Sequence, residues 1–313
     1  MSQSTLEPTL HIGCSTDDNY VHHACVMLCS LLENNPDDRI VVHLLHEKLT
    51  PKNQKAISHL VERYKAEIVF HRVDTTKLAG VKFRKKRPLS LAAYYRLLLS
   101  SLLPQTDKIL YLDVDMVVLG KIKPLFELDI EPYGVAAVKD VVPCIDEHRV
   151  QLSIPYGQDY FCSALMLINL KYWREHDSEA RLLEFAKRER KIFCHDQDAL
   201  NYVFKNSWYQ LPPKWNRFSG WLFPDRYFKT KQDKQEYYRS PAIIHFSAYN
   251  PADRKLFVPL ETYYKKYLTL SGFQMAYKPI RIGQRIKSFP IALLRKLKFE
   301  YLKIGRASCR ERV

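Results

Sequence analysis

Two carboxylates separated by one residue follow a short apolar run. Residues 109–112 (ILYL) have the branched and aromatic composition of a buried strand, and Asp113 and Asp115 come directly after them. A buried carboxylate without a counter-charge is costly, so this pair needs compensation. A hard divalent cation such as Mn²⁺ or Mg²⁺, together with a diphosphate, would provide it. The spacing therefore indicates a metal and diphosphate site, although the Asp-x-Asp triplet alone recurs by chance.

The elements that must position this pair alternate between strand and helix. The patterns predict strands at 10–15, 40–45, 67–73 and 108–113, and helices at 19–36, 50–64 and 90–104. Asn19, Thr50 and Ser90 are the expected N-caps of these helices. This order is typical of a mostly parallel sheet covered by helices, in which ligands bind beyond the carboxyl ends of the strands. The two aspartates lie at such an end.

The later part of the chain has shorter elements. Strands are expected at 133–140, 164–170 and 241–247, and helices at 178–190 and 196–204. Residues 207–240 are rich in aromatic residues, Pro and Lys with weak periodicity, and are predicted to form loops. We therefore expect an α/β domain at 1–260 followed by a basic C-terminal segment at 261–303.

The last ten residues have a different character. Residues 304–313 (IGRASCRERV) resemble the translation of a sequencing adapter. We interpret them as a non-native read-through, expect the true C-terminus to be missing, and exclude them from functional reasoning.

Composition and charge narrow the class of protein. The chain of 313 residues is 46% hydrophobic and 27% charged, as in folded globular proteins. Its net charge of +15 is uneven, because residues 278–303 contain eight Lys or Arg and one Glu. This favours an anionic surface as the partner of the tail, and no nucleic acid is expected. The absence of an apolar run of about 18 residues and of a secretory signal, with scattered cysteines, predicts a cytoplasmic protein.

Six segments resemble one enzyme family. KILYLDVDMVVLGKIKPLFELD (108–129) is similar to the metal-binding segment of family 8 glycosyltransferases, in particular the bacterial lipopolysaccharide galactosyl- and glucosyltransferases. The other segments, in the same order as in the family, are CSTDDNY (14–20), AAYYRLLL (92–99), YFCSALMLINLKYWRE (160–175), HDQDALN (195–201) and IIHFS (243–247). The resemblance spans about residues 10–250. It implies a GT-A (Rossmann-like) fold that binds a UDP-hexose with Mn²⁺ or Mg²⁺ and transfers galactose or glucose to a saccharide, with retention of anomeric configuration.

The resemblance also implies a set of binding residues. Asp113, Asp115 and His245 would be the metal ligands, and imidazole suits a borderline cation such as Mn²⁺. The nucleotide-sugar contacts would be Ser15, Asp17, Asn19, Tyr20, Arg96, Asp113, Val114 and Asp140. Asp17 and Asn19 would bind uracil or ribose, and Tyr20 would stack on the base. The alternatives are a helix cap at 17–19, a structural salt bridge for Arg96, and a satisfied strand-end histidine.

Three polar residues would face the sugar. Asp196 would accept hydrogen bonds from its hydroxyls, and the amide oxygen of Gln197 would lie beneath the anomeric carbon, with Asp198 as a further partner. The alternative is a helix N-terminus at which acidic residues interact with the helix dipole.

The chain departs from the family pattern at two places. Residues 161–164 read FCSA where the family has FNAG, so Cys162 replaces an amide. After His245 the usual GxxKPW is absent, Ala248 stands where Gly is expected, and Lys255 or Arg254 would have to replace the family's lysine. These changes leave the donor sugar open.

The basic tail combines cations with Ile, Leu and Phe. Residues 289–304 could form an amphipathic helix on an anionic membrane, which would suit a lipid-linked acceptor. The protein would then be peripheral on the inner face of the cytoplasmic membrane. A solvated tail or an inter-subunit helix is the alternative.

Two other functions are compatible with parts of the sequence. Haloacid-dehalogenase-type phosphatases also have Asp-x-Asp after an apolar strand, but the later acidic pair of that class is not found. A catalytically impaired, membrane-associated UDP-sugar-binding protein is the second alternative. Release of UDP with sugar transfer would separate these functions.

Overall fold

The computed structural model describes residues 8–81, 90–140, 150, 152–155, 158–188, 194–220, 223, 225–247 and 259–273. The predictions for the basic tail at 278–303, for residues 304–313 and for Ala248, Arg254 and Lys255 lie outside these residues.

The first part of the central sheet follows the predicted alternation of strand and helix. It contains β1 (Leu10–Ser15), α1 (Val21–Asn34), β2 (Ile40–His46), α2 (Pro51–Arg63) and β3 (Glu67–Arg72). β1 pairs in parallel with β2, and β2 pairs in parallel with β3. Thr50 is the N-cap residue of α2, as predicted, and Pro51 occupies its first position.

The start of α1 differs from the prediction. Tyr20, not Asn19, occupies the N-cap. Asn19 lies in the preceding turn, where its backbone N–H donates to Asp17 Oδ1 (2.9 Å). This local bond from a short polar side chain favours a turn over a helix, so α1 begins at Val21.

The helix predicted at residues 90–104 is mostly wound more tightly than an α-helix. The 3₁₀ helix η2 (Leu91–Leu98) is followed by the short α3 (Leu99–Leu102). Ser90 caps η2 by accepting a hydrogen bond from Ala92 N–H (3.3 Å). Because 3₁₀ winding aligns residues i and i+3, Arg96 lies over Ala93, and its Nε donates to the Ala93 carbonyl (2.9 Å).

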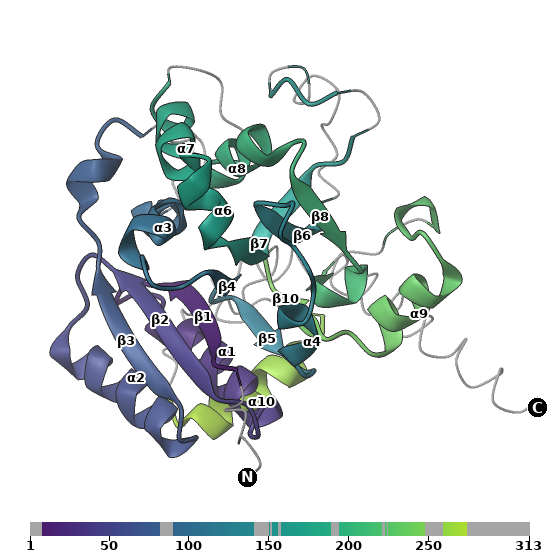
Figure 1. The fold of residues 1–313 in the computed structure, drawn as a ribbon. Helices are drawn as coiled ribbons and strands as arrows, with labels where there is room; N and C mark the ends of the chain where they lie inside the picture. Colours follow the sequence, from purple (N-terminus) through teal and green to yellow (C-terminus); the bar gives the residue numbers. More distant parts are fainter. Residues whose placement is uncertain are drawn as a thin grey trace, which may run out of the picture.

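The rest of the central sheet is arranged around one long strand. β7 (Phe161–Asn169) runs antiparallel to β4 (Lys108–Leu112) and to β6 (Val135–Lys139), and β6 pairs in parallel with β8 (Trp208–Leu211). β4 is also parallel to β1, so the strand order is β3-β2-β1-β4-β7-β6-β8. Most pairings are parallel, and the predicted α/β class is confirmed (Figure 1).

A second, smaller sheet continues from the end of β4. It consists of β5 (Met116–Val118), β10 (Ile243–His245) and β9 (Arg217–Phe218), in the order β5-β10-β9. β10 is antiparallel to β5, with His245 opposite Met116. Residues 113–115 therefore connect the two sheets, which places both aspartates where the sheets meet.

Helices cover both faces of the central sheet. On β4, Leu110 and Leu112 pack into one apolar core with α1 and α10 (Glu261–Ser271), whereas Ile109 and Tyr111 pack into another with η2. This is the alternation expected of a strand buried on both faces. The second layer also contains α6 (Leu170–Glu175), α7 (Ser178–Lys187) and α8 (Asp196–Phe204). In Figure 1 these three helices lie above the sheet, and α1 and α10 lie below it.

The prediction of loops at residues 207–240 was wrong in several places. This region contains β8, β9, the 3₁₀ helices η3 (Pro213–Trp215) and η4 (Asp225–Tyr227), and the helix α9 (Lys231–Arg239). α9 buries little apolar surface, with Tyr237 as its one fully buried residue, so it shows no apolar period. The sequence feature that indicates this helix is a capping box, in which the side chains of Thr230 and Asp233 each accept a hydrogen bond from the other's backbone N–H.

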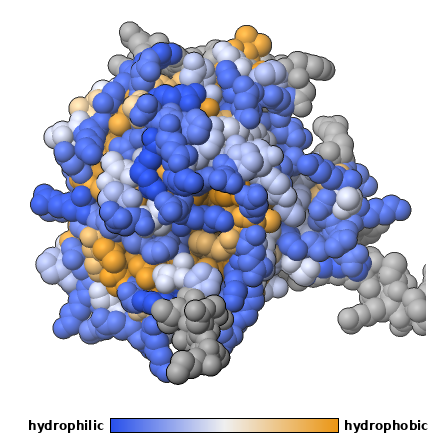
Figure 2. Space-filling model, in the orientation of Figure 1, coloured by the Kyte–Doolittle hydropathy of each residue, from blue (hydrophilic) through white to orange (hydrophobic). Residues whose placement is uncertain are grey.

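Apolar side chains are mostly enclosed. The face shown in Figure 2 is largely hydrophilic, with apolar groups in separate patches. None of the helices in the described part of the chain has both the length and the apolar character needed to cross a bilayer. Two short helices remain in the described chain, the 3₁₀ helix η1 (Thr75–Leu78) after β3 and α4 (Lys123–Phe126) after β5.

Candidate active site

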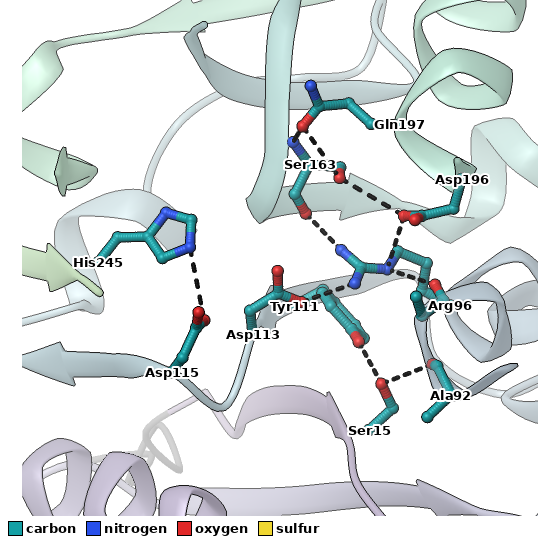
Figure 3. Close-up of polar contacts among 11 residues, drawn as sticks. Ser15, Ala92, Arg96, Tyr111, Asp113, Asp115, Ser163, Asp196, Gln197 and His245 are labelled. Carbon is teal, nitrogen blue, oxygen red and sulfur yellow. Dashed lines mark hydrogen bonds and ion pairs between the residues drawn. The ribbon is translucent and has the colours of Figure 1, made fainter. Parts of the chain in front are cut away.

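Three metal-ligating side chains meet where the two sheets join. Asp113 follows β4, Asp115 precedes β5, and His245 ends β10. One ligand atom from each of the three lies within 4.8 Å of the other two. His245 Nε2 is 3.4 Å from Asp115 Oδ1 (Figure 3). Two carboxylates and an imidazole form a donor set that suits a divalent cation.

A neighbouring amide orients the imidazole. His245 Nδ1 lies 3.1 Å from Asn216 Oδ1, and both side chains are buried. The amide oxygen can only accept, so Nδ1 carries a proton and Nε2 faces the aspartates. Such outer bonds to metal-ligating histidines are usual, and this one supports the fit of the three residues to a cation.

Burial and charge oppose each other at these residues. Burial raises the pKa of Asp113, Arg96 opposes this effect, and Asp115 adds to it. Burial would also raise the pKa of Asp115, but His245 outweighs it and the pKa is lowered. For His245, burial lowers the pKa, but the carboxylate of Asp115 more than compensates, so its pKa is raised. A proton and a divalent cation would therefore compete for the imidazole of His245.

Arg96 is the buried cation beside this group. Its Nη2 donates to Asp113 Oδ1 (2.6 Å), and its Nε is 3.2 Å from Asp196 Oδ2. Nη1 donates to the Ser163 carbonyl (2.7 Å), and the guanidinium lies over the Tyr111 ring. Arg96 therefore links two carboxylates, as in the salt-bridge alternative, and it does so beside the group of Asp113, Asp115 and His245 (Figure 3).

Gln197 joins another part of the predicted set. Its Oε1 accepts from Ser163 N–H (2.9 Å), and its Nε2 donates to Asp140 Oδ2 (2.8 Å). A backbone donor on one side and a carboxylate acceptor on the other permit only this orientation of the amide. The structure thus brings Asp140, Gln197 and Asp196 together around Ser163, whose Oγ lies 3.5 Å from Asp196 Oδ2.

The start of α8 places these side chains. His195, the N-cap residue, has φ 54° and ψ −122°, an uncommon conformation for a residue other than glycine. Asp196 and Gln197 follow directly and are buried. Burial raises the pKa of Asp196, while Arg96 opposes the rise. Backbone strain of this kind is often found beside functional residues.

Asp198 is turned away from the other members of the predicted catalytic group. Its Oδ1 accepts from the Tyr160 hydroxyl (2.8 Å), and its Oδ2 accepts from Cys194 N–H (3.1 Å). These bonds give Asp198 a structural task at the start of α8, and its part in catalysis stays a prediction.

Four of the predicted nucleotide-sugar contacts, Ser15, Asp17, Asn19 and Tyr20, lie at the end of β1 and in the turn that follows it. Ser15 Oγ donates to the Ala92 carbonyl (2.9 Å) and lies 2.6 Å from the Tyr111 hydroxyl, so it ties β1 to η2 and β4. Asp17 accepts from Ser90 Oγ (3.0 Å) in addition to Asn19 N–H.

The two side chains beyond Asp17 remain accessible. Asn19 is exposed, and Tyr20 is 44% exposed. Val114, which separates the two aspartates in the sequence, is buried in the apolar core that contains α1. An exposed ring beside an acidic turn is available for stacking on a base.

Sequence reasoning missed several residues around the site. Tyr111 has the sequence pattern of an ordinary strand residue. Its ring nevertheless packs under the Arg96 guanidinium, and its hydroxyl forms a hydrogen bond with Ser15 Oγ. Asn216 lies in the segment that was predicted as loop. His23 lies in α1, is 1% exposed, and is close enough to Asp115 for the two to shift each other's pKa. The only sequence signal for His23 is a polar residue within an apolar helix face.

The described part of the chain contains five cysteines, and four of them are buried. Cys14, Cys25, Cys29, Cys162 and Cys194 are free thiols. Cys162 is buried beside the site, and burial raises the pKa of its thiol. It lies next to His245, which partly offsets that rise.

The fold and the site together define a class of protein. The sequence model of Glycosyl transferase family 8 matches residues 11–251, and the chain belongs to this family. This range includes the aspartates, Arg96, the start of α8 and His245.

Individual relatives are similar over most of the chain. General stress protein A of Bacillus subtilis (strain 168) is 30% identical over 246 residues, which are 76% of this chain and 85% of the relative. A lipopolysaccharide 1,2-glucosyltransferase of Escherichia coli (strain K12) is 28% identical over 262 residues, 82% of this chain and 76% of the relative. Among solved structures, galactosyltransferase LgtC in complex with donor and acceptor sugar analogs matches with a TM-score of 0.72 and 25% identity, covering 89% of this chain and all of LgtC.

Proposed function

We propose that this protein is a retaining hexosyltransferase that moves galactose or glucose from a UDP-sugar to a saccharide acceptor and depends on Mn²⁺. The observation that carries the proposal is the group of Asp113, Asp115 and His245 at the junction of the sheets of a family 8 chain. Mg²⁺ is the alternative cation, but an imidazole ligand favours Mn²⁺ over the harder Mg²⁺.

The proposed metal site acts on the leaving group. Asp113, Asp115 and His245 would hold the cation, and the cation would neutralise the charge that develops on the diphosphate of UDP. Arg96 keeps Asp113 ionised and oriented, because its guanidinium donates directly to that carboxylate. Tyr111 and Ser163 hold Arg96 in place, so its geometry is fixed before the donor binds.

The donor would lie across the carboxyl ends of β1 and β4. Asp17 and Asn19 would bond the uridine, Tyr20 would stack on the base, and Ser15 and Val114 would line the pocket. The contribution of Ser15 to this pocket would be mainly structural, because its hydroxyl bonds the Ala92 carbonyl of η2 and the Tyr111 hydroxyl.

The sugar would lie between Asp196, Gln197 and Asp140. Asp196 and Asp140 can accept hydrogen bonds from its hydroxyls. Gln197 Oε1 accepts from Ser163 N–H (2.9 Å), and Ser163 Oγ lies 3.3 Å away. When that hydroxyl donates to Asp196 Oδ2 instead, the second lone pair of the amide oxygen can face the anomeric carbon as positive charge develops there. In this reaction a bond forms between the acceptor oxygen and the anomeric carbon, the bond from that carbon to the diphosphate breaks, and the departing phosphate takes the acceptor proton.

The acceptor is proposed to be a surface glycan under construction. Two supports are the names of relatives that are lipopolysaccharide glucosyl- or galactosyltransferases and the basic sequence at 278–303. In this proposal residues 1–260 form the transferase domain and residues 261–303 the basic C-terminal segment. Because α10 packs on α1, residues 278–303 of that segment would attach the protein to the anionic inner face of the cytoplasmic membrane. Residues 304–313 take no part.

A panel of UDP-sugars, read out by UDP production, tests the reaction. We expect turnover with UDP-galactose or UDP-glucose in the presence of Mn²⁺, loss of turnover with EDTA, and an α-linked product by NMR. Binding of a UDP-sugar without turnover would favour the catalytically impaired alternative. Release of inorganic phosphate from phosphomonoesters would favour the phosphatase, and an inverted product would exclude retention.

Truncation tests the proposed membrane contact. Removal of residues 278–313 is expected to abolish sedimentation with phosphatidylglycerol vesicles while leaving turnover of a soluble acceptor unchanged. Each basic residue near the lipid contributes about 1 kcal/mol, so replacing Arg295, Lys296 and Lys298 with Gln should weaken binding by about 100-fold. Phosphatidylcholine vesicles are the control. Unchanged binding of both variants would rule out this role for the tail.

A further inference from the structure

A row of three histidines crosses one face of the parallel part of the central sheet. His11 of β1, His43 of β2 and His71 of β3 come from adjacent strands, which lie side by side in Figure 1. His11 Nδ1 is 2.9 Å from His43 Nε2, and His43 Nδ1 is 3.0 Å from His71 Nε2. Neighbouring rings have their centroids 5.2 Å apart. The transfer reaction proposed above uses none of these side chains.

The register of the strands explains this histidine row. His11 pairs with Val41 and His43 pairs with Val69, so each histidine lies two residues beyond the partner of the one before it. Residues two apart in a strand point to the same face of the sheet. His43 is 7% exposed, whereas His11 and His71 are partly exposed, and Val69 beside His43 is 42% exposed. A small ion can therefore reach both ends of the row from solvent.

The hydrogen bonds of the row are those of neutral imidazoles. A neutral imidazole has one N–H donor and one acceptor nitrogen, so three rings in a row form both bonds when all the N–H groups point the same way. Burial lowers the pKa of His11 and of His71, and lowers that of His43 to about 4. At neutral pH the imidazoles are therefore in the form that binds metal ions.

Neighbouring nitrogens in the row have the spacing of two ligands on one ion. Two nitrogens that bind an ion at about 2.0–2.1 Å are about 2.8–3.0 Å apart when the angle between them is about 90°, and about 3.3–3.4 Å apart in a tetrahedron. The observed distances of 2.9 and 3.0 Å agree with the first case. Square-planar or tetragonal coordination by nitrogen is typical of Cu²⁺ and Ni²⁺.

We propose that the histidine row binds one Ni²⁺ or Cu²⁺ ion through His43 and one of its two neighbours. The two ligating rings must turn so that both lone pairs point to the ion, and the broad χ2 torsion of histidine permits this. With the ion between His43 Nδ1 and His71 Nε2, the proton of His43 is on Nε2, and His11 Nδ1 is able to accept it in a hydrogen bond. The third histidine thus supplies the outer bond that metal-ligating histidines usually make.

Calorimetric titration of the full chain with NiCl₂ at neutral pH is the test. It is done in the Asp115→Asn background, which removes one ligand of the candidate active site. His43→Gln removes both pairs and should weaken Ni²⁺ binding by about 100-fold or more. His11→Gln and His71→Gln each leave one pair and an amide oxygen that can accept from His43, so each should weaken binding by no more than about 10-fold. The double variant should bind as weakly as His43→Gln.

An exposed histidine outside the row provides the control. His59 lies on α2, and His59→Gln should leave Ni²⁺ binding unchanged. Circular dichroism checks that every variant is folded. If His43→Gln did not fold, the double variant would replace it, because His11 and His71 are the more exposed members of the row.

Two outcomes would overturn the inference. One is Ni²⁺ binding by His43→Gln or by the double variant as tight as in the starting protein. The other is a loss in either single end variant as large as that in His43→Gln, since the ion would then not bind through one pair at a time. The inference does not rest on the proposed function, which would fail separately if the wild-type protein bound no Mn²⁺ and UDP.

Discussion

Asp115→Asn is expected to lower Mn²⁺-dependent turnover of the UDP-sugar by about 1000-fold while the protein remains folded. Asparagine has the size of aspartate but not its charge, so the cation loses one of two anionic ligands. Electrostatic stabilisation of the leaving group is worth several kcal/mol, and about 4 kcal/mol corresponds to this factor. The fold should persist because the amide oxygen of Asn can still accept from His245, now 3.4 Å from Asp115 Oδ1.

Turnover should be compared with that of a variant in an unrelated carboxylate. Asp37 is exposed and pairs with Lys121 at 3.1 Å, far in sequence from the site. Asp37→Asn is expected to keep full activity. Retention of about a tenth or more of the activity in Asp115→Asn, at saturating Mn²⁺, would contradict the metal assignment.

Arg96→Met is expected to destabilise the protein by about 3–5 kcal/mol and to abolish turnover. Arg96 is 4% exposed and pairs with Asp113 and Asp196, so its removal leaves two carboxylates without their cation. Arg96→Lys keeps the charge, but an ammonium group cannot reproduce the four contacts that the planar guanidinium makes with two carboxylates and two backbone carbonyls. We expect it to recover part of the stability and little of the activity.

Urea unfolding measures the loss, and an exposed ion pair provides the comparison. Arg39 pairs with Glu67 at 3.3 Å, and both side chains are more than half exposed. Arg39→Met should therefore change the free energy of unfolding by less than about 1 kcal/mol. An Arg96→Met protein as stable as the wild type would show that the buried pairs are not needed to compensate these carboxylates.

The sequence predicted the first half of the fold well because its elements are long and periodic. β1, β2, β3 and β4 are apolar runs bounded by polar residues, and α2 begins with Thr50 and Pro51. Of the small sheet only β10 was predicted, within the strand expected at 241–247. β5 and β9, of three and two residues, are too short to show a period. α9 was missed because charged residues cover most of it, although its capping box was visible in the sequence.

The candidate site was predictable where its residues lie at strand ends. Asp113 and Asp115 were found from their spacing alone, and His245 and Arg96 required the resemblance to the family. Partners distant in the chain could not be found this way. The hydrogen-bonded residues His23 and Tyr264 are 241 residues apart, and Asn216 and His245 are 29 residues apart. Only the fold brings such pairs together.

The orientation of polar groups was also beyond the sequence. Asp198 reads like Asp196, since both are acidic residues in the first turn of α8. In the structure Asp196 pairs with Arg96, whereas Asp198 bonds Tyr160 and the backbone of Cys194. The difference arises because successive residues of a helix project about 100° apart, so side chains two residues apart point to nearly opposite sides.

Crystals grown with MnCl₂ and UDP, with data collected at the manganese absorption edge, test the central claim most directly. The account predicts one anomalous peak within about 2.0–2.6 Å of carboxylate oxygens of Asp113 and Asp115 and of His245 Nε2, with the diphosphate completing the coordination. UDP bound with no anomalous peak among these three side chains, or a peak elsewhere in the chain, would contradict it.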